Sequence, residues 1–150
     1  MASGLDRLEA LRRRLDAMAA GYWRLDGDHR LIQVGFVASD ALPVDAASLF
    51  AATTRIVPLD RTDLGIVAAF LIGRRYVSVV PKLPSQEGSG FWLRMFGASR
   101  SVAVPIGRGV VSVALTGIEP DEDEVERVLL EEVGASDSWD DLFPFPWIPS

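Results

Sequence analysis

Two arginines and one tryptophan carry the side chains best suited to bind a small molecule in this sequence. Arg94 and Arg100 lie close together in the chain, and guanidinium groups bind carboxylates and phosphates through paired hydrogen bonds. Trp92 precedes them, and its indole ring can stack on a planar ligand. The alternative interpretation is that the ring belongs to the core and that the arginines pair with Asp60 or Asp63.

Residues for catalysis do not gather in the same way. The chain has 1 histidine, His29, which falls in a predicted turn far from the candidate nucleophiles Ser78, Ser99 and Ser112. A lone imidazole beside two aspartates makes a poor metal site, so we interpret His29 as an exposed turn residue. We therefore predict that the protein is not an enzyme.

Cysteine and glycine patterns exclude further chemistry. The chain has 0 cysteines, which excludes a thiolate nucleophile, a thiolate metal site and a thiol-attached cofactor. Gly88-Ser89-Gly90 and Gly107-Arg108-Gly109 lack the third glycine and the helix of a dinucleotide-binding motif. The acidic residues 121–124 lack the spacing of a calcium loop. No cofactor and no metal are predicted.

Charge and hydropathy limit the partners. The net charge of -6 and the pI near 4.7 argue against nucleic acid, because such binding rests on neutralising phosphates. No apolar run reaches the roughly 18 residues of a membrane span, and the N-terminus lacks the apolar core of a signal peptide. We expect a cytoplasmic protein that binds neither membranes nor nucleic acid.

The stretch over residues 99–117 predicts a β-hairpin, with β-branched residues on both arms. An even-sized turn at Gly107 and Gly109 sets Val104 against Val111 or Val113, so that large residues meet large ones. One face of the hairpin is then bulky, and the opposite face is small. Because both faces of the hairpin can pack against apolar residues, we predict a sheet that is covered on both sides. The small face comprises Ser101, Ala103, Ser112 and Ala114.

The remaining patterns predict five helical segments and three more strands. An apolar stripe of Leu8, Leu11, Leu15 and Met18 predicts a first helix that ends at Gly21. Strands are expected over residues 22–25, 30–39 and 76–80, and helices over 44–54, 64–72, 91–96 and from Pro120 to Gly134. Thr62 or Asp63 is expected to cap the helix over 64–72. That helix is apolar all round, which predicts that it is enveloped or forms a pocket wall.

In this order the chain resembles the GAF domain family. The likeness rests on FAATTRIVPL over residues 50–59 with the following helix over 63–73, on the strand over 74–81, and on SRSVAVPI followed by GVVSVALTG. It covers about residues 5–134. The resemblance implies an α+β fold with a five-stranded antiparallel sheet in the order 2-1-5-4-3, counting strands along the chain. It also implies that the terminal helices cover one face, and that short helices and loops form a pocket on the other.

The resemblance implies a sensory or regulatory domain that binds a small molecule and dimerises through its terminal helices. Bilin-binding members commonly attach their chromophore through cysteine, which this chain lacks. On the implied pocket face we expect seven ligand-binding residues, Phe70, Tyr76, Ser78, Phe91, Trp92, Arg94 and Arg100. A ligand sensor predicts an enclosed cavity of several hundred cubic ångströms, about the usual range of binding pockets.

The alternative function is an interaction or dimerisation module that has no ligand. It predicts a filled pocket and a two-fold interface of roughly 1,200 Å² or more. In either case residues 1–134 are expected to form the domain, and residues 135–150 a tail rich in proline and aromatic residues. The apolar side chains of this tail are costly to leave in water. We expect the tail to fold back over the domain rather than to dock on a partner, because a groove on the same chain is present at high effective concentration.

Overall fold

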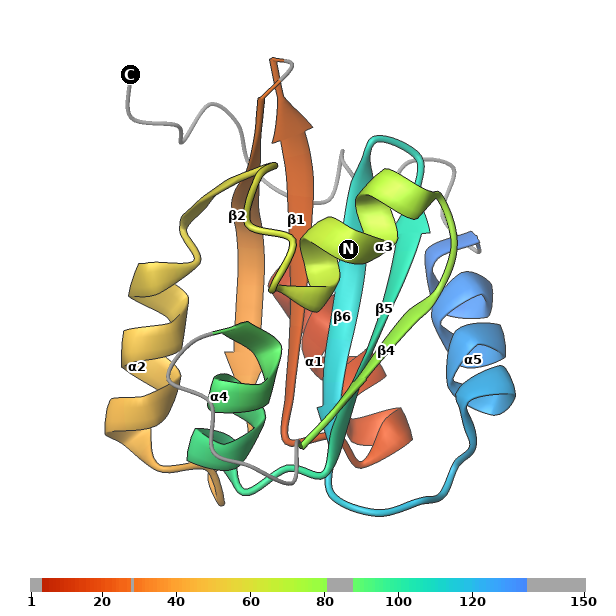
Figure 1. The fold of residues 1–150 in the computed structure, drawn as a ribbon. Coiled ribbons are helices and arrows are strands. Elements are labelled where there is room, and N and C mark those ends of the chain that lie inside the picture. The colour runs from red at the N-terminus through yellow and green to blue at the C-terminus, as the bar shows by residue number, and fades with distance from the viewer. Residues whose placement is uncertain (1–3, 28, 81–87, 135–150) are drawn as a thin grey trace.

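The computed structural model describes residues 4–27, 29–80 and 88–134. These residues form an antiparallel sheet with helices packed on both faces (Figure 1). In chain order the elements are α1 (Gly4–Leu15), β1 (Ala19–Asp26), β2 (Arg30–Ala38), α2 (Val44–Thr53), β3 (Ile56–Pro58), α3 (Gly65–Ile72), β4 (Tyr76–Val79), α4 (Gly88–Phe96), β5 (Arg100–Ile106), β6 (Gly109–Leu115) and α5 (Glu122–Gly134). The predicted tail over residues 135–150 lies outside the described residues.

The sheet has six strands in the order β3-β2-β1-β6-β5-β4, so the predicted count of five was wrong. The missed strand, β3, pairs Ile56 with Ile32 and Pro58 with Arg30 at the edge beside β2. A strand of three residues is too short to show an alternating pattern, and its proline argues against a strand in the sequence. The other strands follow one another as expected once β3 is set aside.

The β5-β6 hairpin has the predicted even-sized turn. Val104 lies opposite Val111, and Ala103 lies opposite Ser112. Gly107 has a φ of 58°, which an L side chain adopts only with strain. Pro105 pairs with Val110 beyond the last partner of β4, so its missing N–H costs the sheet no bond.

The two faces of the hairpin separate two cores. The bulky face packs against α1 and α5, where Leu8, Leu11, Val125 and Leu129 are fully buried. The small face lies under α2, α3 and α4, which contribute Ala46, Val67 and Trp92 respectively to the second core. The predicted division, with terminal helices on one face and short helices on the other, is confirmed.

The first helix is shorter than predicted, because α1 ends at Leu15 and Asp16 turns the chain with a φ of 51°. Met18 donates its backbone N–H to the carbonyl of Ala114 on β6, so the chain pairs with the sheet from this residue on. Gly21 therefore lies inside β1 and does not end a helix. Its lack of a side chain serves the packing of Trp23, whose ring lies over it.

The predicted cap of α3 was wrong, whereas one of the two arrangements predicted for this apolar helix is confirmed, because Gly65 and Ile66 form part of a pocket wall. Leu64 precedes the helix with an extended backbone and no side-chain cap, and the hydroxyl of Ser89 on α4 instead accepts the N–H of Gly65 at 2.7 Å. Gly73 ends the helix in the left-handed conformation, as expected. The helix is not enveloped, because Leu71 and Ile72 are about half exposed.

Candidate functional site

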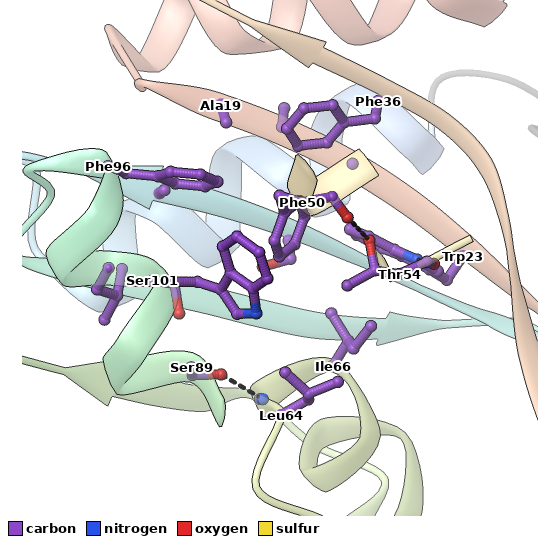
Figure 2. A pocket seen from close by; sticks show the side chains of 17 residues that line it. Ala19, Trp23, Phe36, Phe50, Thr54, Leu64, Ile66, Ser89, Phe96 and Ser101 are labelled. Carbon is purple, nitrogen blue, oxygen red and sulfur yellow. Dashed lines mark hydrogen bonds between the residues drawn. The ribbon is translucent and has the colours of Figure 1, made fainter. Parts of the chain in front are cut away.

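A small cavity lies between the sheet and the helices α2, α3 and α4 (Figure 2). Its volume is about 50 Å³. A cavity of roughly 150 Å³ admits benzene, so this cavity as it stands holds a few water-sized groups and no complete ring. It is therefore smaller than the several hundred cubic ångströms expected of a ligand sensor.

The floor of the cavity is made by small residues of three adjacent strands. Ala19 and Gly21 come from β1, Ser112 and Ala114 from β6, and Ser101 from β5. These residues share a face because side chains alternate along each strand and the strands are in register. Their small size leaves the space above the sheet that larger residues would fill.

The wall of the cavity is aromatic, and Phe50 of α2 lies at its centre (Figure 2). The ring of Phe50 meets the rings of Trp92 and Phe96 edge-on, at centroid distances of 5.1 and 5.3 Å. It also lies 5.2 Å from the ring of Phe36 and 6.1 Å from that of Trp23. Such edge-to-face contacts favour a rigid, apolar enclosure.

The polar groups around Trp23 and Thr54 are already bonded within the protein. The indole N–H of Trp23 donates to the carbonyl of Thr54 at 2.8 Å, and the Thr54 hydroxyl donates to the carbonyl of Phe50 at 2.7 Å. Gln33 in turn donates its side-chain amide to the Thr54 hydroxyl at 3.1 Å. These groups fasten α2 to the sheet and are not available to a ligand.

The hydroxyls of two serines on the floor, in contrast, are not bonded to other described groups. Within residues 4–27, 29–80 and 88–134, the side chains of Ser101 and Ser112 have no hydrogen-bond partner. Each hydroxyl can donate one hydrogen bond and accept two. They are the polar groups through which the floor could orient a ligand.

None of the described residues that line this cavity carries a titratable side chain. The shifted carboxylates lie elsewhere: on α1, hydrogen bonds from Arg12 and then from Arg13 lower the pKa of Glu9 to about 2. The guanidinium of Arg14 on α1 lowers the pKa of Glu131 on α5. Among the described residues no cluster of histidine, aspartate and glutamate could hold a metal ion. The described lining of the cavity thus offers shape and hydrogen bonds but no acid or base.

The structure places Trp92, of the seven predicted site residues, in the wall of the cavity. Phe91 packs edge-on against Trp92 at 5.1 Å, and Phe70 packs against the same core. Tyr76 and Ser78 flank the start of α3, where a Cβ on Gly65 would lie 2.9 Å from the Ser78 oxygen. These four residues surround the cavity region without lining it, and a role in binding stays a prediction for them.

The two predicted arginines lie on different sides of the sheet. Arg94 is exposed on α4. Arg100 is buried on the opposite face, where it donates to the carbonyls of Gly117, at 2.8 Å, and Pro120, and lies 3.5 Å from Glu122. The pair does not form a clamp at the cavity. The alternative pairing differs too, because Asp63 binds Arg61 at 2.8 Å.

Sequence reasoning missed most of the lining. Ser101 and Ser112 were recognised as members of a small face, which is the signal that could have identified the floor. Phe50 shows only a weak signal, because the alanines near it give α2 a thin apolar face. His29 is exposed in the β1-β2 turn, as expected.

Comparison with solved structures finds proteins whose fold is similar to that of this chain. The GAF domain of a two-component sensor histidine kinase from Bacillus halodurans superposes with a TM-score of 0.59 at 10% identity, over 85% of this chain and 86% of that chain. A GAF domain/HD domain protein from Geobacter sulfurreducens gives 0.58 at 11% identity, over 90% and 93%. The phycoerythrobilin-bound GAF domain of a cyanobacterial phytochrome gives 0.57 at 14% identity, over 90% and 82%.

Sequence comparison adds no relative to these, because neither a family model nor a curated protein matches the chain. At identities of 10 to 14% the likeness concerns the fold alone. No described helix is long and apolar enough to cross a membrane.

Proposed function

The chain has the GAF fold, and on this premise we propose that it is a non-enzymatic sensory domain whose signal is a small, mainly apolar molecule bound at the aromatic cavity. The observation that carries the proposal is the cavity itself, which lies on the sheet face covered by α2, α3 and α4. Two hydroxyls without a hydrogen-bond partner in the described part of the chain border it. The phycoerythrobilin-bound neighbour supports ligand binding by a domain of this shape.

The chemistry of the cavity limits the ligand. Binding sites are mostly apolar with a few placed polar groups, and this lining has that composition. At about 50 Å³ the cavity takes a ring only if a wall residue moves. Trp92 is the candidate, because its indole is the largest side chain that the short helix α4 contributes to the lining. The proposed ligand is therefore a single aromatic ring with one hydroxyl or amine, admitted by displacement of the Trp92 side chain.

A second candidate function is the ligand-free dimerisation module, and two observations favour it. The cavity is nearly filled, and the terminal helices leave Leu5 and Leu130 about half exposed. A symmetric pair of α1 and α5 helices would cover these leucines in a dimer.

Thermal unfolding with phenol and indole as probes, followed by native mass spectrometry, separates the two functions. If the cavity binds a ring, saturating phenol raises the melting temperature by several degrees, since a ligand at 100 times its Kd contributes about 2.7 kcal/mol. Trp92→Leu should bind phenol at least tenfold more tightly, because displacement of the indole no longer opposes binding. Met95→Leu, an exposed change on the same helix, should bind as the wild type does.

The opposing result is a melting temperature that no probe changes in either the wild type or Trp92→Leu. In that case the cavity is a packing defect, and a ligand role is wrong. A dimer in the mass spectrum that Leu130→Glu dissociates, while the equally exposed Leu49→Glu on α2 does not, would then support the dimerisation module.

A further inference from the structure

The strand β4 has one edge that no described strand covers. β4 is last in the sheet order and pairs with β5 alone. Val80 donates its backbone N–H to the carbonyl of Ser99 at 3.3 Å, so alternate residues point their backbone groups toward β5. The N–H and C=O groups of Val77 and Val79 consequently face the open edge.

Apolar side chains surround this edge and remain exposed. Val79 is 63% exposed and Tyr76 is 40% exposed on the strand itself. Leu71 and Ile72, at the end of the helix that leads into β4, are 52% and 50% exposed. The unpaired N–H and C=O groups of an open edge can bond to another strand, and proteins usually cover such an edge when its neighbours are apolar.

The end of α5 lies close enough for the chain that follows it to reach β4. Glu126 of α5 lies 3.1 Å from Arg75, the residue before β4, and Figure 1 shows α5 beside this connection. Gly134 ends the helix eight residues after Glu126, which is about 12 Å along the axis. Residues 135–150 can span about 50 Å when extended, so the edge is within their reach.

The sequence of this tail has the pattern of an outermost strand. Residues 142–149 read Leu-Phe-Pro-Phe-Pro-Trp-Ile-Pro, with prolines at alternate positions 144 and 146. In an edge strand every second N–H points away from the sheet, so prolines at those positions cost no bond. Phe143 and Phe145 each precede a proline, which biases them to extended backbone.

We propose that residues 142–148 pair with the open edge of β4 as a seventh strand. The N–H groups of Phe143, Phe145 and Trp147 would face β4, and the prolines would face solvent and stop further strand addition. The apolar tail side chains would cover the exposed residues around the edge. Asp137, Asp140 and Asp141 precede the strand, and their charge complements the exposed Arg74 at the start of the edge.

Disulfide trapping in the full chain tests this pairing, because the chain has 0 cysteines and introduced thiols react without competition. Val79→Cys is combined with a single cysteine at each position from 141 to 148 in turn. The expected result is an intramolecular disulfide whose yield varies with a period of two residues and exceeds by at least tenfold that of Val44→Cys pairs. Val44 is the matched control, since it is 76% exposed on the distant helix α2.

Two outcomes would overturn the proposal. Equal yields from the Val79→Cys and Val44→Cys pairs would mean that the tail does not settle on β4. A predominant disulfide between the thiols introduced at position 79 of two chains, recognised by its doubled mass, would mean that the edge pairs with a second copy of the protein.

Hydrogen exchange gives a second test that introduces no crosslink. Phe145→Pro removes an N–H that faces β4, and the amides of Val77 and Val79 should then exchange at least tenfold faster. Leu142→Pro places a proline at the same alternation as the natural ones and should leave both amides protected. Unprotected amides in the wild type, or equal effects of the two prolines, would contradict the pairing.

Discussion

Gly21 and Trp23 show how one missing side chain shapes the cavity. A Cβ at Gly21 would lie 2.4 Å from Cη2 and 2.5 Å from Cζ3 of Trp23, closer than any real contact. Trp23 cannot yield, because it is 1% exposed and its indole N–H is bonded to Thr54. The glycine thus lets a large ring lie flat on the sheet beside the cavity.

Gly21→Ala is expected to destabilise the protein by about 1–3 kcal/mol, the usual cost of overpacking a rigid core. Urea unfolding followed by tryptophan fluorescence measures the change. The control is Gly117→Ala, whose new Cβ would meet its nearest atom at 3.9 Å and should cost less than about 0.5 kcal/mol. Similar free energies for the two variants would show that the Trp23 ring is free to move.

At the scale of elements, Arg100 joins the pocket-bearing strand β5 to the start of α5. Its side chain is 6% exposed, and its guanidinium satisfies the carbonyls of Gly117 and Pro120. The next residue along β5, Ser101, points to the cavity floor. The sequence suggested a ligand-binding role for Arg100, whereas its observed contacts hold the connection between two elements.

We expect Arg100→Met to cost about 1–3 kcal/mol, because it removes a buried guanidinium that donates to two part-buried carbonyls. Arg75→Met is the matched control: Arg75 also binds α5, at Asp123 and Glu126, but from a more exposed position, and should cost at most about 1 kcal/mol. Chemical denaturation of both variants makes the comparison. An equal loss would mean that the carbonyls near α5 find water when the guanidinium is removed.

For the whole molecule, ion pairs on and between the terminal helices make stability depend on pH. Arg12 holds the pKa of Glu9 at about 2, and nearby arginines lower the pKa values of Glu124 and Glu131. A carboxylate whose pKa is lower in the folded state stabilises that state fully above its unfolded pKa. This stabilisation is lost as the pH falls from about 4.5 toward 2.

The melting temperature is therefore expected to change little from pH 7 to 5 and to fall steeply below pH 4.5. Glu9→Gln should lose about 1–2 kcal/mol at pH 7, after allowance for solvent screening, and should depend less on pH in the acid range. Calorimetry across this range measures both effects. Glu119→Gln, an exposed change outside the ion pairs of the described residues, should follow the wild-type curve. A Glu9→Gln curve parallel to the wild type would show that Glu9 is not the group responsible.

The sequence by itself determined the features that depend on near neighbours in the chain. The even size of the hairpin turn, which sets Val104 against Val111 or Val113, followed from matching side-chain sizes, and the structure has the Val111 register. The same alternation separated the bulky face from the small face, because a strand sends successive side chains to opposite sides. The resemblance of the element order then implied the correct covering of each face by helices.

Only the tertiary structure decided the dimensions and contacts of the site. The cavity volume depends on how rings from α2 and α4 pack over the floor, and no local pattern encodes a distance between such remote segments. Arg100 likewise binds the carbonyls of Gly117 and Pro120 in the segment before α5, because its position on β5 points its side chain away from the cavity. The physical reason is that periodicity specifies a face, whereas a volume and a bonding partner arise from the summed packing of segments distant in the chain.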